Sequence, residues 1–209
     1  MKTPTNNFDF VAPFYDFLAK IIFGKNIQTA QTHFLNHIPK DAHILILGGG
    51  SGLILKEIFA IRNECQIHYV ETSKKMIALS KKQLTKLQLE QVVFAQDMDE
   101  NTNQIFDVII TNFFLDVFEK KELKNVMQLL QRLLNKEGFW LFTDFQHQNI
   151  WWQKILLKLM FLFFRAFANL ESKELYDFEK EFKILEMNSH ESKSFFHEMI
   201  ISHVYSAEL

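Results

Sequence analysis

The sequence has few of the residues that would indicate a disulfide framework, a linker or an export signal. Cys65 is its single cysteine, so no disulfide can form within the chain of 209 residues. The segment 1–8 lacks the basic and then apolar layout of a secretory signal, and we therefore expect a cytoplasmic protein. Only three prolines occur, and no repeat or low-complexity linker interrupts the chain, so we predict a single domain over residues 1–209.

Neither sign of charge is in large excess. The formal net charge is -2 and the isoelectric point is near 6.4. Binding to nucleic acid depends on clustered cations, so a nucleic-acid substrate is disfavoured. The chain contains eight histidines, but none lies at convincing metal-ligand spacing from another histidine, a cysteine or a carboxylate. We therefore predict no metal site.

Glycine is scarce but concentrated. Four of the six glycines lie within residues 48–52, between an apolar strand pattern at 44–47 and a helical pattern at 53–62. A strand, a glycine turn and a helix bring backbone N–H groups and a helix N-terminus up to a polar ligand. The turn lacks both the third glycine of a dinucleotide fingerprint and the Gly-Lys-Ser/Thr of a phosphate loop. A plain tight turn remains the alternative.

Acidic side chains follow two further predicted strands. Residues 66–70 end at Glu71, about 20 residues beyond the glycines, where a carboxylate in a doubly wound sheet accepts hydrogen bonds from ribose hydroxyls. Residues 91–95 form a third strand that finishes near Asp97, whose carboxylate could accept the amine of an adenine ring. The alternatives are a solvated acid at a strand end and a turn-forming aspartate.

Five segments then follow one another in a characteristic order: 44–52 (Ile-Leu-Ile-Leu-Gly-Gly-Gly-Ser-Gly), 71–76 (Glu-Thr-Ser-Lys-Lys-Met), 94–98 (Phe-Ala-Gln-Asp-Met), 106–112 (Phe-Asp-Val-Ile-Ile-Thr-Asn) and 133–141 (Leu-Leu-Asn-Lys-Glu-Gly-Phe-Trp-Leu). In order and spacing they resemble the motifs of the class I S-adenosylmethionine-dependent methyltransferases. Within that family the chain is most similar to the small-molecule branch that includes quinone-biosynthesis methyltransferases. The family usually has an acid two residues before the first glycine, where this chain has Ile46.

The resemblance implies a fold and a cofactor. The fold is α/β, a doubly wound and mostly parallel sheet of seven strands with an antiparallel last strand, and N-terminal helices within residues 1–40 that cover the site. The cofactor is S-adenosylmethionine, held by the glycines at its methionyl part, by Glu71 at the ribose, and by Asp97 with Met98 at the adenine. The full set of implied cofactor residues is Tyr15, Gly48, Gly49, Gly50, Gly52, Glu71, Thr72, Asp97, Met98 and Asn112.

Apolar patterns predict the elements around these motifs. They indicate helices at 8–23, 27–38, 73–89 and 119–134, and strands at 106–111, 139–143, 182–187 and 199–205. Thr72 or Ser73 is a plausible N-cap for the third of these helices. The last two strands would form the antiparallel end of the sheet.

Two side chains are candidates for acid–base chemistry. His147 follows the strand at 139–143, on the edge where open α/β sheets bind ligands, and an imidazole there could take a proton from an acceptor. A surface histidine without a catalytic role is the alternative. Asp116 follows the strand at 106–111 and is either an acid of the pocket or the start of the next helix.

The segment 149–170 is a strongly apolar helical pattern. On a helical wheel its cations Lys154, Lys158 and Arg165 fall within about 40° of one another. Three cations argue against a transmembrane span, because each costs roughly 2.5–3.5 kcal/mol near the bilayer centre. Within a helical insert at 149–180, such a helix suits a lid over an apolar acceptor, a homodimer face or peripheral contact with anionic lipid. An ordinary helix docked on the sheet is the alternative.

The function that these observations favour is methyl transfer from S-adenosylmethionine to a small acceptor. The apolar helix and the family resemblance suggest an apolar or aromatic acceptor, such as a quinone-like ring or a lipid precursor. The competing hypothesis is a non-catalytic module that binds the cofactor and acts through its apolar helix on a partner or a membrane.

Overall fold

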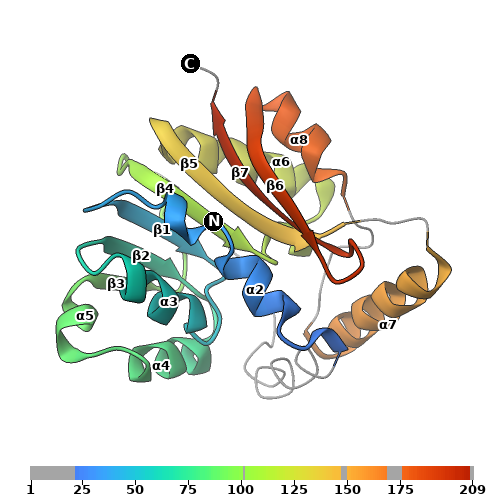
Figure 1. The fold of residues 1–209 in the computed structure, drawn as a ribbon, viewed down its shortest axis with the longest axis horizontal. Helices are drawn as coiled ribbons and strands as arrows, with labels where there is room; N and C mark the ends of the chain where they lie inside the picture. The colour runs from blue at the N-terminus through green and yellow to red at the C-terminus, as the bar shows by residue number, and fades with distance from the viewer. Residues whose placement is uncertain (1–21, 101, 147–149, 169–175, 208–209) are drawn as a thin grey trace.

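The computed structural model describes residues 22–100, 102–146, 150–168 and 176–207, and only the backbone at 160–168. Its centre is a seven-stranded sheet in the order β3-β2-β1-β4-β5-β7-β6 (Figure 1). The strands are β1 (His43–Leu47), β2 (Gln66–Val70), β3 (Val92–Ala95), β4 (Phe106–Asn112), β5 (Leu134–Phe145), β6 (Met187–Phe195) and β7 (Ile200–Ala207). The first five strands in sequence are parallel, and β7 runs antiparallel to β5 and β6. The predicted fold class is confirmed.

Helices pack on both faces of the sheet (Figure 1). They are α2 (Asn26–Thr32), α3 (Leu53–Ile61), α4 (Lys74–Lys82), α5 (Lys86–Glu90), α6 (Lys120–Leu133), α7 (Trp151–Ala168) and α8 (Phe178–Ile184), with short 3-10 turns η1 (Leu35–His37) and η2 (Leu115–Val117). In β1, Leu45 and Leu47 face the cluster built with α6 and α8, while Ile44 and Ile46 face the cluster built with α3. The strand is apolar at successive positions because both its faces are covered.

The helix predicted at 73–89 is interrupted. It forms α4 and then α5, and Thr85 begins the second helix with a capping box in which its hydroxyl accepts from the Gln88 N–H at 3.3 Å. The Gln88 side chain accepts in turn from the Thr85 N–H at 2.9 Å. The reciprocal cap satisfies backbone donors that a continuous helix would have bonded internally. At the start of α4, Ser73, one of the two predicted candidates, is the N-cap.

The strand predicted at 182–187 is wrong, because residues 182–184 lie in α8, residues 185–186 form a turn, and β6 begins only at Met187. Asp177 caps that helix by accepting from the Lys180 N–H at 3.2 Å, and Phe178 and Phe182 lie one turn apart on its buried face. The strand that pairs with β7 is β6, whose residues 189–194 are exposed. Polar composition hid this edge strand from a search for apolar runs.

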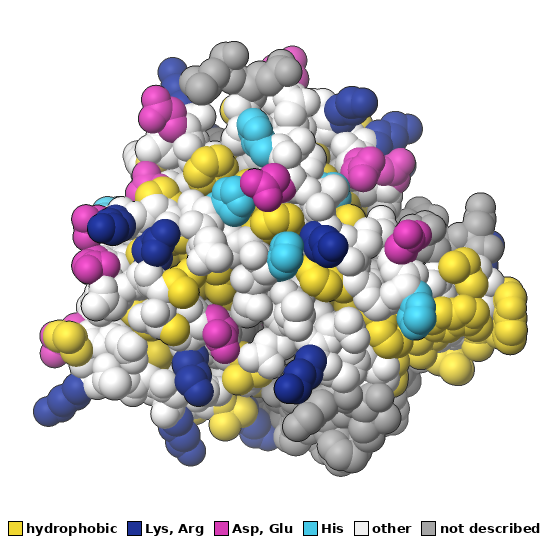
Figure 2. Space-filling model, viewed as in Figure 1, with side chains coloured by type: hydrophobic (Ala, Val, Ile, Leu, Met, Phe, Trp, Pro, Cys, Tyr) yellow, Lys and Arg dark blue, Asp and Glu magenta, His cyan; other side chains and the backbone are white. Residues whose placement is uncertain are grey.

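The helix predicted at 149–170 is present as α7, and its first half packs on the β6–β7 turn. Gln153 donates to the His197 carbonyl oxygen at 2.8 Å, and Leu157 is buried beside Phe145 and Ile200. The outer face of this half is apolar and exposed, with Trp151 at 73%, Ile155 at 51% and Leu159 at 59% of their surfaces open. Hydrophobic side chains accordingly gather over α7 (Figure 2).

Within the described part of the chain, no helix has the length and apolarity needed to cross a membrane. Before the sheet, the helix predicted at 27–38 is observed as α2 followed by η1. The helix predicted at 8–23 lies outside the described residues except for its last two.

Candidate functional site

The parallel strands β1 to β5 end at the same edge of the sheet, and the predicted motifs meet there. At the end of β1 the chain turns through residues 48–52 into α3. The Gly48 N–H donates to the Val70 carbonyl oxygen at 2.9 Å, which fixes the turn to the end of β2. The glycine motif and the acid motif are therefore neighbours in space as well as consecutive in sequence.

The glycines of this turn have different roles. A Cβ on Gly49 would collide with the ring of Tyr69, and a Cβ on Gly52 would collide with Ser80 on α4, so these two positions allow close packing. Gly50 has a φ of +63°, and a Cβ there would meet nothing within 4 Å. Gly50 is thus glycine for its left-handed backbone conformation and lies beside open space, as a backbone that approaches a ligand requires.

Glu71 connects the turn to the next helix. One carboxylate oxygen, Oε2, accepts from the Gly50 N–H at 2.9 Å, and the other, Oε1, accepts from the Ser73 N–H at 2.9 Å. The side chain is only 9% exposed. Tyr69 supports the same turn, since its hydroxyl donates to the Gly50 carbonyl oxygen at 2.8 Å and burial raises its pKa. The Thr72 hydroxyl donates to Oε1 at 3.5 Å.

The remaining cofactor candidates are placed at the neighbouring strand ends. Asp97 is exposed just after β3, and Met98 is buried in the apolar cluster of α6. Asn112 ends β4 opposite Thr143 and is partly exposed. Tyr15 lies outside the described residues. Ile46, where the family usually has an acid, is 1% exposed and packs in the α3 cluster.

Two carboxylates come together where β4 and β5 end. Asp116 lies on η2, which packs against β5, and burial raises its pKa to about 6. Asp144, in β5, has no exposed surface. Its pKa is raised well above its ordinary value, first by burial and then by the charge of Asp116. Both groups therefore hold protons more tightly than free aspartates do.

Asp144 was not identified from the sequence. Its Oδ1 accepts from the Phe145 N–H at 2.8 Å, whereas its Oδ2 has no hydrogen-bond partner among the residues that the structure describes. The available signal was an acid directly after the buried residues 139–143. His147, the other acid–base candidate, lies outside the described residues. Across the described ranges no group of three or more metal-binding side chains is assembled.

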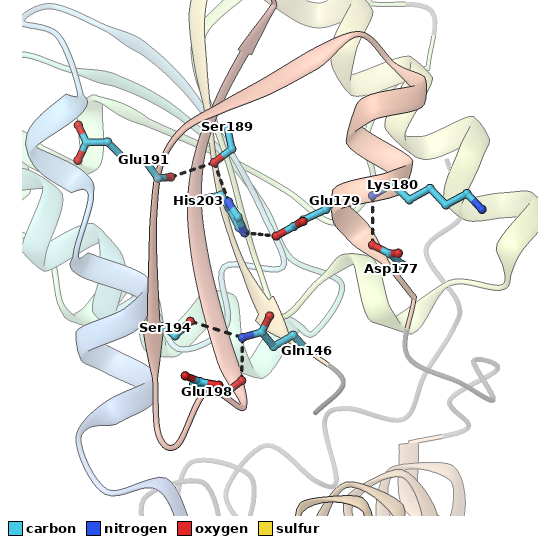
Figure 3. A network of polar contacts seen from close by, with 9 residues as sticks. All are labelled: Gln146, Asp177, Glu179, Lys180, Ser189, Glu191, Ser194, Glu198 and His203. Atoms are coloured by element: carbon cyan, nitrogen blue, oxygen red, sulfur yellow. Dashed lines mark hydrogen bonds and ion pairs between the residues drawn. The ribbon is translucent and has the colours of Figure 1, made fainter. Parts of the chain in front are cut away.

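A hollow of about 440 Å³ lies beside this acid pair, between α8 and the strands β5 and β7. It is lined by Phe142, Gln146, Tyr176, Asp177, Phe178, Glu179, Ile201 and His203. Figure 3 shows His203 between the hydroxyl of Ser189, 2.8 Å from Nδ1, and the carboxylate of Glu179, 3.9 Å from Nε2. Burial lowers the pKa of His203 to about 4, so the ring is neutral near pH 7.

Comparison with known proteins agrees with this arrangement. Residues 45–140 match the family described as a methyltransferase domain. The chain is 26% identical over 141 residues to a polyamine aminopropyltransferase of Methanocaldococcus jannaschii, and the alignment covers 56% of this chain and 48% of the relative. The chain therefore spans about half the length of that curated relative.

Solved structures share the fold at low sequence identity. One is an O-methyltransferase of neocarzinostatin biosynthesis, in complex with S-adenosylmethionine and a hydroxy-methyl naphthoic acid. It is 8% identical, with a TM-score of 0.66 over 94% of this chain and 56% of that one. Another is a Haloferax volcanii complex of a methyltransferase with the Trm112 activator, 10% identical, with a TM-score of 0.72 over 99% and 100% of the two chains. The family match and the strand order identify residues 45–140 as a methyltransferase domain, built on the fold of the class I S-adenosylmethionine-dependent methyltransferases.

Proposed function

We propose that this chain is an S-adenosylmethionine-dependent methyltransferase that acts on a small molecule. The observation that carries the proposal is the turn at Gly50, whose left-handed backbone lies beside open space and whose N–H donates to the Glu71 carboxylate. The cofactor would lie against this turn, with its ribose hydroxyls at Glu71 and its adenine near Asp97. Glu71 can accept hydrogen bonds from the backbone of the turn and from the ribose at once, because each carboxylate oxygen has more than one lone pair.

The chemistry demands little beyond positioning. A sulfonium methyl group is already activated, so the site must exclude water and hold the acceptor atom in line at about 3 Å. The end of β4 is suited to holding the acceptor because it packs against the glycine turn at residues 48–52. Phe114 lies so close to Gly48 that a Cβ on this glycine would be 2.8 Å from its ring. An acceptor at the ends of β4 and β5 would therefore lie next to the transferred methyl group.

Two observations support a small acceptor of apolar or aromatic character. The hollow beside β5 has about the volume of a small organic molecule and is lined partly by aromatic rings. The O-methyltransferase with the same fold holds a naphthoic acid. The second candidate function is a non-catalytic cofactor-binding module, which Ile46 favours because the usual acid is missing.

Calorimetry with S-adenosylmethionine and with S-adenosylhomocysteine tests the shared part of both hypotheses. We expect micromolar binding of each, and no binding of either would refute both. A second experiment separates the two hypotheses: the protein is incubated with isotopically labelled S-adenosylmethionine and a cell extract, and methylated products are sought by mass spectrometry. Labelled product favours the enzyme, whereas tight binding without any product favours the module.

A further inference from the structure

The hollow and the acid pair are neighbouring parts of one structure, in which Asp144 is fully buried, Asp116 is partly exposed, and neither lines the hollow itself. Phe142 and Gln146, which line the hollow, lie two residues before and two residues after Asp144, Phe142 on β5 and Gln146 directly past its end. Ile201, also in the wall, is the residue of β7 directly opposite Asp144. On the other side, the Tyr176 hydroxyl donates to the Phe118 carbonyl oxygen at 3.0 Å, just past η2. The acid pair therefore lies between the glycine turn and the hollow.

Asp144 is the unusual member of this structure. A carboxylate without exposed surface is normally paired with a cation or fully hydrogen-bonded, because the desolvated charge is expensive. Here Oδ2 completes no hydrogen bond among the described residues, although the backbone N–H groups of Leu115 and Asp116 approach the carboxyl group and lower its pKa slightly, and the charge that acts on it is that of another carboxylate, Asp116. A second anion cannot compensate the first, and the raised pKa values mean that the empty pair keeps a proton. A bound cation could take the place of that proton.

The wall of the hollow suits a positive charge as well. The acidic groups that line it are Asp177, the N-cap of α8, and Glu179 of α8; Tyr176 and the neutral His203 of β7 are the other titratable lining residues, and no lysine or arginine is among them. Lys180, the cation drawn near this wall, extends away from His203 in Figure 3. Aromatic rings complete the wall and can hold a cation against their faces.

Three rings of this wall pack against one another. The ring centroids of Phe142 and Phe178 are 4.9 Å apart, and those of Tyr176 and Phe178 are 6.2 Å apart. These rings supply an apolar surface next to the acidic groups. A ligand with an amine at one end and an apolar body at the other would match both parts.

We propose that the acceptor is an amine, bound as a cation between the Asp116–Asp144 pair and the aromatic wall of the hollow. This inference rests on the proposed function and specifies its substrate class. In the transfer step the carboxylate of the pair accepts an N–H proton, which frees the nitrogen lone pair. The nitrogen then forms a bond to the methyl carbon while the carbon–sulfur bond breaks and its electrons stay on sulfur. The products are the N-methylated amine and S-adenosylhomocysteine.

Three matched compounds test the charge preference. 2-Phenylethylamine, 2-phenylethanol and phenylacetate share a ring and differ at one end, which is cationic, neutral or anionic at pH 7.5. Calorimetry is carried out with and without S-adenosylhomocysteine. We expect the amine to bind at least about tenfold more tightly than the alcohol and the acid most weakly, a difference of about 1.4 kcal/mol. Equal binding of amine and alcohol, or no binding of the amine, would overturn the inference.

Variants locate the preference. Asp144→Asn and Asp116→Asn should each remove the tenfold advantage of the amine while leaving alcohol binding unchanged. Glu137→Gln is the matched control, because Glu137 is an exposed acid of the same strand at the opposite edge of the sheet. It should leave all three affinities unchanged. If the advantage persisted in both aspartate variants, the amine would be bound elsewhere and the inference would fail.

Proton release gives an independent measurement. Because the pair holds a proton when the site is empty, amine binding should release up to about one proton, and alcohol binding none. The number is obtained from the binding enthalpy in phosphate and in Tris, whose ionisation enthalpies differ. Amine binding without proton release would contradict a role for the pair. Failure of S-adenosylhomocysteine to bind would count against the proposed function. The amine titration without S-adenosylhomocysteine would still test the amine site by itself.

Discussion

Replacement of His203 by asparagine should make the folded protein more resistant to acid. The pKa of this ring is lowered from 6.5 to about 4 by burial, so between these pH values the unfolded chain binds a proton that the folded chain does not. The contribution of His203 to the free energy of unfolding is present above pH 6.5 and is lost as the pH falls towards 4. At about 1.4 kcal/mol per pKa unit, that loss is about 3 kcal/mol.

Asp116 acts in the opposite direction over nearly the same range. Its pKa is raised from 3.8 to about 6, so here the folded chain binds the proton more tightly. Its contribution is present below pH 3.8 and is lost as the pH rises through 6, again about 3 kcal/mol. In the wild-type protein the two contributions therefore offset each other between pH 6 and 4.

The assay is urea unfolding of the wild type, His203→Asn and Asp116→Asn at intervals between pH 4 and 7. Relative to the wild type, acidification should stabilise His203→Asn and destabilise Asp116→Asn, by about 3 kcal/mol in each case over the range. Asparagine can keep a hydrogen bond to Ser189 but does not titrate. Lost packing would lower the free energy of unfolding by the same amount at every pH and so would not change its dependence on pH. Three parallel curves would refute the reasoning.

Further predictions concern binding. Glu71→Ala should weaken binding of S-adenosylmethionine by roughly 1.5–3 kcal/mol in calorimetry, because hydrogen bonds to a charged group are lost, and unchanged affinity would place the ribose elsewhere. Gly50→Val should abolish cofactor binding, whereas Gly49→Val should mainly lower the melting temperature because its side chain meets Tyr69; a Gly50 variant that binds normally would contradict the turn's role. The double variant Lys154→Gln, Lys158→Gln should co-sediment less with anionic vesicles than the wild-type protein, and wild-type co-sedimentation should fall as salt rises. Vesicle binding that responded neither to charge removal nor to salt would exclude an electrostatic contact through α7.

The sequence predicted those parts of the site that depend on local signals. Residues 48–52 are unusual in composition, and Glu71 follows a strand at a characteristic distance, so both positions could be found without knowing the fold. Asp144 could not be found in this way. Its importance depends on burial and on the approach of Asp116 from another element, and neither is written in the residues around it.

The errors in the fold have a similar origin. In α8 the helix is set by the Asp177 cap and by two phenylalanines one turn apart, signals too short to outweigh an apolar run that also suits a strand. The position of β6 was missed because edge strands need only one partner and can be polar. The break between α4 and α5 depends on the side chain of Gln88, which a helix pattern does not distinguish from any other polar residue.

The polar edge strand β6 also bears on self-association. An open strand edge offers unpaired backbone groups to a second molecule, and flat apolar edges lead to aggregation. In β6 the exposed charges of Glu191 and Lys193 lie along the edge, and the register with β7 shifts between Ser189 and Glu191. At the other edge β3 has only four residues. Both ends of the sheet thus disfavour the stacking of copies into a continuous β-structure, even though the sheet between them is apolar on both faces.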